Sequence, residues 1–346
     1  MNKLAEELDA QRRKVDFDSY DISVQQMLSM VADGNIDIAP EYQRHFRWKD
    51  EGRSQLIESV FLGIPIPPLF MATNRDGTWE VVDGVQRLST LIHYAGDDKH
   101  RKEIGETSHL TLKGLDKLVS LNGSTFQQLP QNIKTQFLLR PIKVVTLSDK
   151  SDSVVRFDLF ERLNTGGVSL TDQEIRACVF RGEFNQFLAQ LAQESDFRAV
   201  VKLPPTKRED RTNEECILRF FAFLHSYKSF DHSVVGFLND YMKSANKYFD
   251  YDAGRSIFKD TFRQLAKLFP EGIYRGTRKS TPINLYEAVA VGAALAIQKN
   301  GRIARQRSTD WVSGSELHAL TTGATNTKPM VVGRIEYCAK RFGWKA

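Results

Sequence analysis

The stretch WEVVDGVQRLSTL, residues 79–91, changes from a strand pattern to a helix pattern across one tight turn. Trp79–Val82 is rich in β-forming residues, Asp83 and Gly84 form the turn, and Leu88–Tyr94 has apolar residues at helical spacing. The first N–H groups of a helix are unpaired and partly positive, so an anion binds well there. Glycine lets the backbone approach such an anion closely. The stretch therefore predicts a phosphate site on a strand–turn–helix unit.

Three polar side chains of this turn suggest chemistry. Arg87 offers a bidentate fork to a phosphate, and Gln86 can orient a water or hold a sugar or phosphate oxygen. Asp83 can bind Mg²⁺ or polarise a water. The alternative interpretation is structural: Asp83 caps the helix, and Arg87 makes a surface ion pair.

A second segment, Ile36–Trp48, interleaves aromatic residues with Arg44 and Arg47. Such a segment can stack a base and contact phosphates, so we predict that Tyr42, Gln43 and Arg44 bind the nucleotide. The alternative is a loop whose aromatic residues fill the core and whose arginines face water.

A third segment, Phe160–Arg176, combines Arg162 and Asn164 with a glycine turn and a capped helix. Thr171 followed by Glu174 has the spacing of a capping box, which predicts a helix start. The functional interpretation is a second wall of the pocket, with Arg162 and Asn164 facing the ligand. The alternative is a corner between helices, in which Asn164 satisfies nearby backbone groups.

Around these segments the chain has two styles of sequence. Residues 1–150 mix strands, turns and short helices, whereas residues 151–346 have helical spacing almost throughout. We therefore predict an α+β fold, in which a domain with a small mixed sheet precedes an all-α region, and in which residues 151–180 complete the pocket. The predicted helices and strands of the first part are Val24–Ala32, Ile36–Ile38, Ser54–Leu62, Leu69–Ala72, Trp79–Val82, Leu88–Tyr94 and Ile142–Leu147.

Composition excludes several classes of protein. Of the 346 residues 41% are hydrophobic and 26% charged, which is ordinary for a globular protein, and the net charge of +5 permits nucleic-acid binding without requiring it. Cys178, Cys216 and Cys338 are far apart and are expected to be buried free thiols. The N-terminus lacks the apolar core of a signal peptide, and no run reaches the ~18 apolar residues of a membrane span. We expect a cytoplasmic protein without membrane contact.

Taken together, the three segments resemble the N-terminal domain family of GmrSD-type modification-dependent restriction enzymes. The family's hallmarks are a PxxQRxxxW segment, a helix ending in a PIPP-like run, a strand–DGQQR–helix turn and a downstream RxNxxGxxLxxxEI segment. In this chain they correspond to Pro40, Gln43, Arg44 and Trp48, to Leu56–Pro68, to Asp83–Arg87 and to Arg162–Ile175.

The resemblance implies a fold similar to ParB and sulfiredoxin, which hold nucleotide phosphates on this same strand–turn–helix unit. It also implies NTP hydrolysis, with Mg²⁺ as the expected cofactor, that gates DNA cleavage. One departure is Val85, where the family usually has glutamine, and it puts one polar contact in doubt. Relatives often carry a His-Asn-His nuclease domain, whereas Thr321–Phe342 contains no histidine. The resemblance therefore suggests a nuclease partner in trans.

The sequence thus predicts a nucleotide-binding, NTP-hydrolysing subunit of a restriction system. Asp83, Gln86 and Arg87 would be catalytic, and Gly84 would lie at the phosphates. Two alternatives remain open: a non-enzymatic DNA-binding adaptor that senses modified DNA, and a DNA-nicking endonuclease. We expect DNA contact at the basic residues Lys202, Lys207, Arg208 and Arg211, unless these only form a solvated link between helices.

Overall fold

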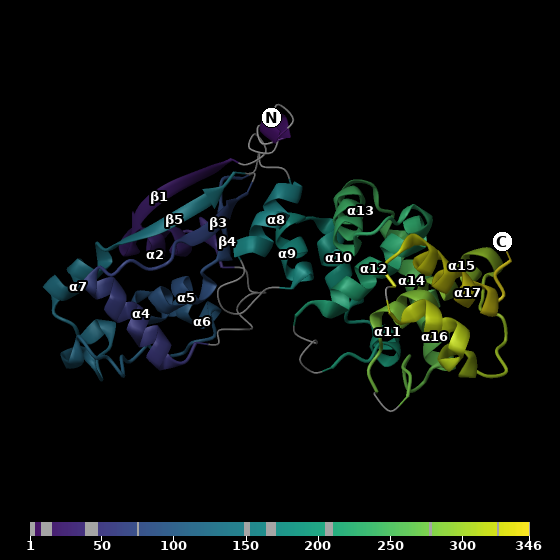
Figure 1. Ribbon diagram of the computed structural model, residues 1–346. Helices are drawn as coiled ribbons and strands as arrows, with labels where there is room; N and C mark the ends of the chain where they lie inside the picture. The colour runs from purple at the N-terminus through teal and green to yellow at the C-terminus, as the bar shows by residue number, and fades with distance from the viewer. Residues whose placement is uncertain are drawn as a thin grey trace. The chain divides into compact units, whose positions relative to one another are not determined.

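The computed structural model describes residues 4–7, 16–38, 48–74, 76–148, 153–163, 171–204, 210–276, 279–323 and 325–345. The chain divides into two compact units, Met1–Val168 and Ser169–Ala346. The first unit ends at Val168, whereas the predicted boundary lies between residues 150 and 151. Helix α8 (Ser153–Leu163) therefore belongs to the first unit. Figure 1 labels most of the elements of each unit.

The first unit contains a five-stranded mixed sheet, which confirms the predicted α+β class for this part. Its strand order is β1-β5-β3-β4-β2. β1 pairs antiparallel with β5, β5 parallel with β3, β3 antiparallel with β4, and β4 parallel with β2. The strands are β1 (Phe17–Ser23), β2 (Ile36–Asp37), β3 (Leu69–Thr73), β4 (Trp79–Asp83) and β5 (Pro141–Leu147).

The central hairpin β3–β4 holds the strand that leads into the predicted phosphate turn. Its own turn is closed by the N–H of Asn74, which donates to the Thr78 carbonyl at 2.8 Å, and by Gly77, whose φ is +85°. At the other end the register shifts, because Phe70 lies opposite Asp83 while Met71 lies opposite Val81. β4 therefore has one extra residue immediately before Asp83, and such a bulge changes the direction of the strand's last side chains.

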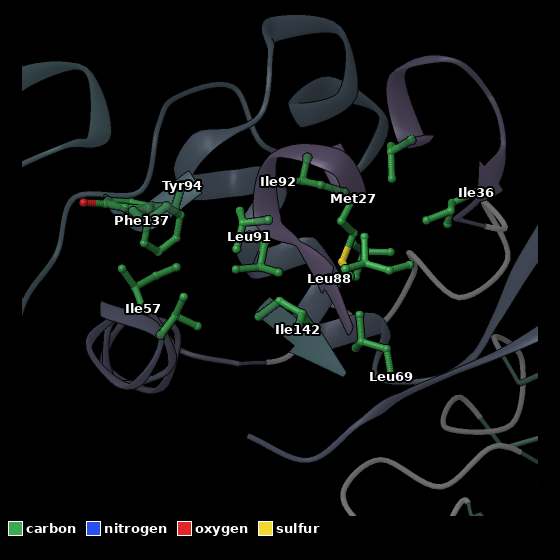
Figure 2. Packing of buried hydrophobic residues seen from close by; sticks show 14 of the residues in the cluster. Met27, Ile36, Ile57, Leu69, Leu88, Leu91, Ile92, Tyr94, Phe137 and Ile142 are labelled. Carbon is green, nitrogen blue, oxygen red and sulfur yellow. The ribbon is translucent and has the colours of Figure 1, made fainter. Parts of the chain in front are cut away.

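Helix α5 forms the centre of the first unit's core. Leu88, Leu91 and Ile92 are buried, and Figure 2 shows them in one cluster with Leu69 of β3 and Ile142 of β5. Each fully buried side chain of this kind contributes ~1.5–3 kcal/mol, so the beginning of α5 is held firmly against the sheet. The helices of this unit are α2 (Val24–Ala32), α4 (Asp50–Leu62), α5 (Val85–Ala95), α6 (Asp98–Glu103), α7 (Gln131–Leu138) and α8.

In the second unit the described residues form helices and connecting turns. α15 is the innermost, because residues on every side of it are buried. No helix among the described residues of the chain has both the length and the apolar character to cross a membrane. The three cysteines are free and buried, as predicted. The helices are α9 (Asp172–Val179), α10 (Glu183–Leu191), α11 (Ser195–Val200), α12 (Thr212–Ser226), α13 (Val234–Tyr248), α14 (Tyr251–Leu268), α15 (Ile283–Asn300), α16 (Ser315–Thr321) and α17 (Lys328–Arg341).

A chain of buried ion pairs ties four of these helices together. Arg176 of α9 contacts Glu215 of α12 at 3.2 Å, and Glu215 contacts Arg219 one turn later at 2.7 Å. Arg219 in turn contacts Glu287 of α15 at 2.7 Å, and Glu287 contacts Arg334 of α17 at 2.5 Å. The side chains of Glu287 and Arg334 are fully buried. Removing one member of such a chain leaves an uncompensated buried charge.

Candidate phosphate-binding site

The turn between β4 and α5 depends on a glycine. Gly84 has φ +100° and ψ +14°, a left-handed conformation that side chains with a Cβ rarely adopt. A Cβ at this position would lie 2.3 Å from Cδ2 of Leu69 and 3.0 Å from Nη2 of Arg87. Gly84 is therefore required both by its backbone angle and by the packing around it.

The beginning of α5 presents backbone donors. Gly84 is the N-cap residue and has no side chain to accept a hydrogen bond from the first turn, and no side-chain cap is found among the described residues. The first turn of α5 contains no acidic residue. The helix dipole thus places partial positive charge at this end, where an anion is favoured.

Arg87 and Asp83 lie at this end of the helix and contact each other. Nη2 of Arg87 is 2.6 Å from Oδ2 of Asp83, one helical turn earlier. The Arg87 side chain is only 11% exposed, against 31% for Asp83. The Nε group of Arg87 is buried and has no hydrogen-bond partner among the described residues. An arginine with a buried donor left over is able to take an additional acceptor.

Gln86 connects this turn to the segment that precedes α4. Its Oε1 accepts a hydrogen bond from the backbone N–H of Trp48 at 3.3 Å, and its carbonyl accepts one from the Thr90 hydroxyl at 2.7 Å. Trp48 is the last residue of the PxxQRxxxW hallmark. Gln86 therefore fixes the end of that hallmark beside the beginning of α5.

A known protein family matches the first part of the chain. Residues 24–181 match the family described as GmrSD restriction endonuclease, N-terminal domain. These residues form a GmrSD N-terminal domain. The resemblance predicted from the sequence is thereby confirmed for this part of the chain. No curated protein matches the chain.

The GmrSD N-terminal domain contains the other predicted ligand residues. Tyr42, Gln43, Arg44 and Asn164 lie outside the described residues. Arg162 is exposed near the end of α8, and α8 packs against β4, the strand that carries Asp83.

The basic residues predicted to contact DNA follow this domain in the sequence. Lys207 and Arg208 lie outside the described residues. Arg211 has φ +58° and pairs with Glu214 at 3.2 Å, so part of its charge is already balanced. Lys202 is half-buried, and its backbone pairs with Thr281.

Sequence reasoning missed a buried polar cluster in the GmrSD domain. Arg53 of α4 contacts Glu106 at 2.7 Å and Nδ1 of His93 at 3.1 Å. His93 lies two turns beyond Gln86 on the same side of α5, at the i+7 position. Burial lowers the pKa of His93, Glu106 opposes this effect, and Arg53 adds to it. The only sequence signal was the helical spacing Gln86–His93, since Arg53 and Glu106 are distant in the chain.

At the phosphate turn the described residues offer one carboxylate to a metal ion, that of Asp83. Within the described residues no group of three or more His, Cys, Asp or Glu side chains could hold a metal ion. Asp83 stands at the phosphate turn, and its carboxylate is half-exposed and next to Arg87. Mg²⁺ is usually held by one or two carboxylates together with substrate phosphates, so Asp83 fits an ion that arrives with a nucleotide.

Proposed function

We propose that this chain is a nucleotide-binding and NTP-hydrolysing subunit of a modification-dependent restriction system used in anti-phage defence. The observation that carries the proposal is the buried Arg87 guanidinium beside the uncapped beginning of α5. Membership of the GmrSD N-terminal domain supports a restriction system, since the family is named after a restriction endonuclease. A ParB/sulfiredoxin-like way of holding phosphates on the strand–turn–helix unit is part of the same proposal.

Binding begins with an exchange of partners at Arg87. A phosphate at the beginning of α5 accepts hydrogen bonds from the backbone N–H groups of the first turn and from both Nε and Nη2 of Arg87. In the structure Nη2 of Arg87 donates to the Asp83 carboxylate at 2.6 Å. The phosphate replaces this carboxylate as the partner of Nη2. Phosphate binding thus releases the Asp83 carboxylate.

The released carboxylate then acts at the phosphoanhydride. Asp83 orients the attacking water or provides one oxygen to a Mg²⁺ ion held mainly by the nucleotide's own phosphates. Such an ion supplies charge neutralisation on the phosphates. Because phosphoryl transfer depends chiefly on positioning and on charge neutralisation, Arg87 and the α5 N-terminus contribute most by holding the phosphates in place.

Within this proposal Gln86 either orients the attacking water or positions the QRxxxW segment. Its side chain oxygen already accepts from Trp48, which favours a role in positioning the QRxxxW segment. Tyr42, Gln43 and Arg44 belong to that segment, and we assign them to the base and phosphates of the nucleotide. Arg162 and Asn164 are assigned to the further wall of the pocket. DNA and a nuclease partner acting in trans complete the proposed system.

The test compares two Asp–Arg pairs in the same unit. Asp83→Asn removes the carboxylate from the site, and Asp98→Asn removes the one that pairs with Arg101 in α6, away from the turn. Wild type should gain thermal stability with GTP, ATP or CTP plus Mg²⁺, by about 2.7 kcal/mol at a hundred times Kd. Hydrolysis should be lost in Asp83→Asn and retained in Asp98→Asn.

Arg87→Ala should abolish the thermal shift itself. If no nucleotide stabilises the wild type, or if Asp83→Asn hydrolyses at the wild-type rate, the proposal is wrong. A wild type that binds DNA but neither binds nor hydrolyses nucleotides would instead support the adaptor alternative. Metal-dependent nicking of a plasmid that is lost in Arg87→Ala would support the endonuclease alternative.

A further inference from the structure

Seven exposed basic side chains gather at the C-terminal ends of α15 and α17. They come from two segments that are separated by more than thirty residues in the sequence, residues 299–307 and 340–345. We call this set the C-terminal basic patch. Its members are Lys299, Arg302, Arg305, Arg307, Lys340, Arg341 and Lys345.

Hydrogen bonds hold the two segments side by side. The N–H of Ala304 donates to the Phe342 carbonyl at 2.9 Å, and Nε2 of Gln306 donates to the Arg341 carbonyl at 2.9 Å. Nδ2 of Asn300 donates to the Gly343 carbonyl at 3.0 Å. The patch is therefore one surface of fixed shape.

The helices that carry these segments also approach each other closely. α15 and α17 lie side by side in Figure 1. A Cβ at Gly292 of α15 would lie 2.7 Å from the backbone N of Ala339, so the glycine permits this approach. The position of the patch is thus built into the core of the second unit.

The seven side chains of the patch form no salt bridge with an acidic residue of the described part. Residues 299–309 and 337–345 contain no aspartate or glutamate. By contrast, Arg219 and Arg334 of the same unit are paired with Glu287. Like charges held together repel one another, so a surface of this kind favours an anionic partner.

The side chains of the patch suit phosphate groups on a nucleic acid. Four of the seven are arginines, which bind phosphate with two parallel hydrogen bonds. The guanidinium of Arg341 lies 5.3 Å from the ring of Tyr337 and donates to its hydroxyl at 3.1 Å, so this arginine is held in place. An anionic lipid surface fits less well, because none of the large hydrophobic residues exposed in the described part belongs to the patch.

We propose that the C-terminal basic patch contacts the phosphate backbone of duplex DNA. The patch lies outside residues 24–181 and differs from the basic residues around Lys207 that the sequence suggested. The choice of DNA, among the polyanions that such a patch could bind, rests on the proposed function. Binding of this kind releases counterions, so affinity falls steeply with salt, by ~0.9 log units per tenfold salt for each phosphate contacted.

The test is DNA binding by the full chain, measured by fluorescence anisotropy of a labelled duplex over a salt series. The patch variant is R302E/R305E/R307E. The three arginine side chains are exposed and form no hydrogen bond or ion pair with the described residues. The control is K228E/K243E/K247E, which reverses three exposed lysines elsewhere in the second unit and changes the net charge equally.

The patch variant should lose at least about a hundredfold in affinity near 0.1 M salt and show a flatter salt dependence. The control should stay within a few-fold of wild type. The inference is overturned if both variants lose affinity equally, if the patch variant binds like wild type, or if the wild type binds vesicles containing phosphatidylserine and not DNA. NTP hydrolysis without DNA should be unchanged in the patch variant. A wild-type protein that does not hydrolyse NTP would contradict the proposed function, but the comparison of DNA affinities would still test the basic patch.

Discussion

Gly84→Ala provides a sharp test of the strand–turn–helix site, because the structure separates two costs of the substitution. The first is the backbone angle: alanine at φ +100° costs ~1–2 kcal/mol. The second is steric, since the new Cβ would lie 2.3 Å from Cδ2 of Leu69, a fully buried side chain. Overpacking of this kind costs a further ~1–3 kcal/mol. We expect the first unit to lose ~2–5 kcal/mol of unfolding free energy.

Gly77→Ala is the matched control. Gly77 has φ +85°, but a Cβ there would meet nothing within 4 Å, so this variant carries the angle cost alone. The unfolding free energies of the two variants, measured with denaturant, should therefore differ by ~1–3 kcal/mol. In Gly84→Ala the Cβ would also lie 3.1 Å from Nε of Arg87, so nucleotide affinity should fall as well. Gly77→Ala should bind nucleotide normally.

A double-mutant cycle identifies the contact responsible. Leu69→Ala removes the atoms that the new Cβ would meet, so the combined Gly84→Ala/Leu69→Ala variant should be more stable than the sum of the single effects predicts, by ~0.5–3 kcal/mol. Equal losses of stability in Gly84→Ala and Gly77→Ala would refute the close approach to Leu69. Unchanged nucleotide binding in a folded Gly84→Ala protein would refute the role of this turn in holding phosphate.

Three further predictions concern groups away from the turn. Glu287→Gln should lower the unfolding free energy of the second unit by ~3–5 kcal/mol, because two buried arginines lose their shared carboxylate. Glu336→Gln should cost ~1 kcal/mol in the same denaturant titration, because among the described residues Glu336 accepts a single hydrogen bond, from the Tyr227 hydroxyl. Burial lowers the pKa of His93 below 6.5, so the folded state resists its protonation and stability should fall as pH drops below about 6.5; a His93→Gln variant with the same pH dependence as wild type would contradict this. The three buried thiols should react with a thiol reagent only after unfolding, and rapid reaction of the native protein would show that one of them is accessible.

The sequence predicted well those helices and strands whose apolar residues recur at the spacing of a helix or of a strand. The helix Val24–Ala32 has the predicted bounds, and β3 and β4 lie where the hairpin pattern placed them. α5 begins three residues before the predicted Leu88, because Gln86 and Arg87 of its first turn are polar and interrupt the apolar spacing. The apolar pattern therefore locates the core of an element and gives its ends less well.

The elements that sequence missed are stabilised by contacts other than an apolar face. β1, Phe17–Ser23, is mostly exposed and has no alternating pattern; it is held by backbone pairing with β5 along its whole length. α6, Asp98–Glu103, consists of charged and polar residues and begins at Asp97, whose side chain accepts from the N–H of His100. Neither element shows a hydrophobic period in its local sequence.

The candidate site was predictable only where its residues are neighbours in the chain. Asp83 and Arg87 are four residues apart at a helix start, so their contact follows from helical spacing. The Arg53–His93–Glu106 cluster and the C-terminal basic patch bring together residues far apart in sequence, and only the packing of helices decides such contacts. Local sequence patterns therefore predicted the turn at Asp83–Arg87 but neither the polar cluster nor the basic patch.

The pair Asp83–Arg87 supports the proposal that the arginine at this turn binds a ligand. Folding has already removed most of the Arg87 side chain from water, yet its Nε has no partner among the described residues, and an unsatisfied buried donor costs ~1–3 kcal/mol. A half-exposed aspartate one turn away satisfies only part of the guanidinium. A phosphate offers several oxygens and recovers the interaction that the fold leaves unmade, without a further cost of desolvating the arginine. Under the proposed function, the free energy that the fold forgoes at Arg87 becomes available to the binding of phosphate at this turn.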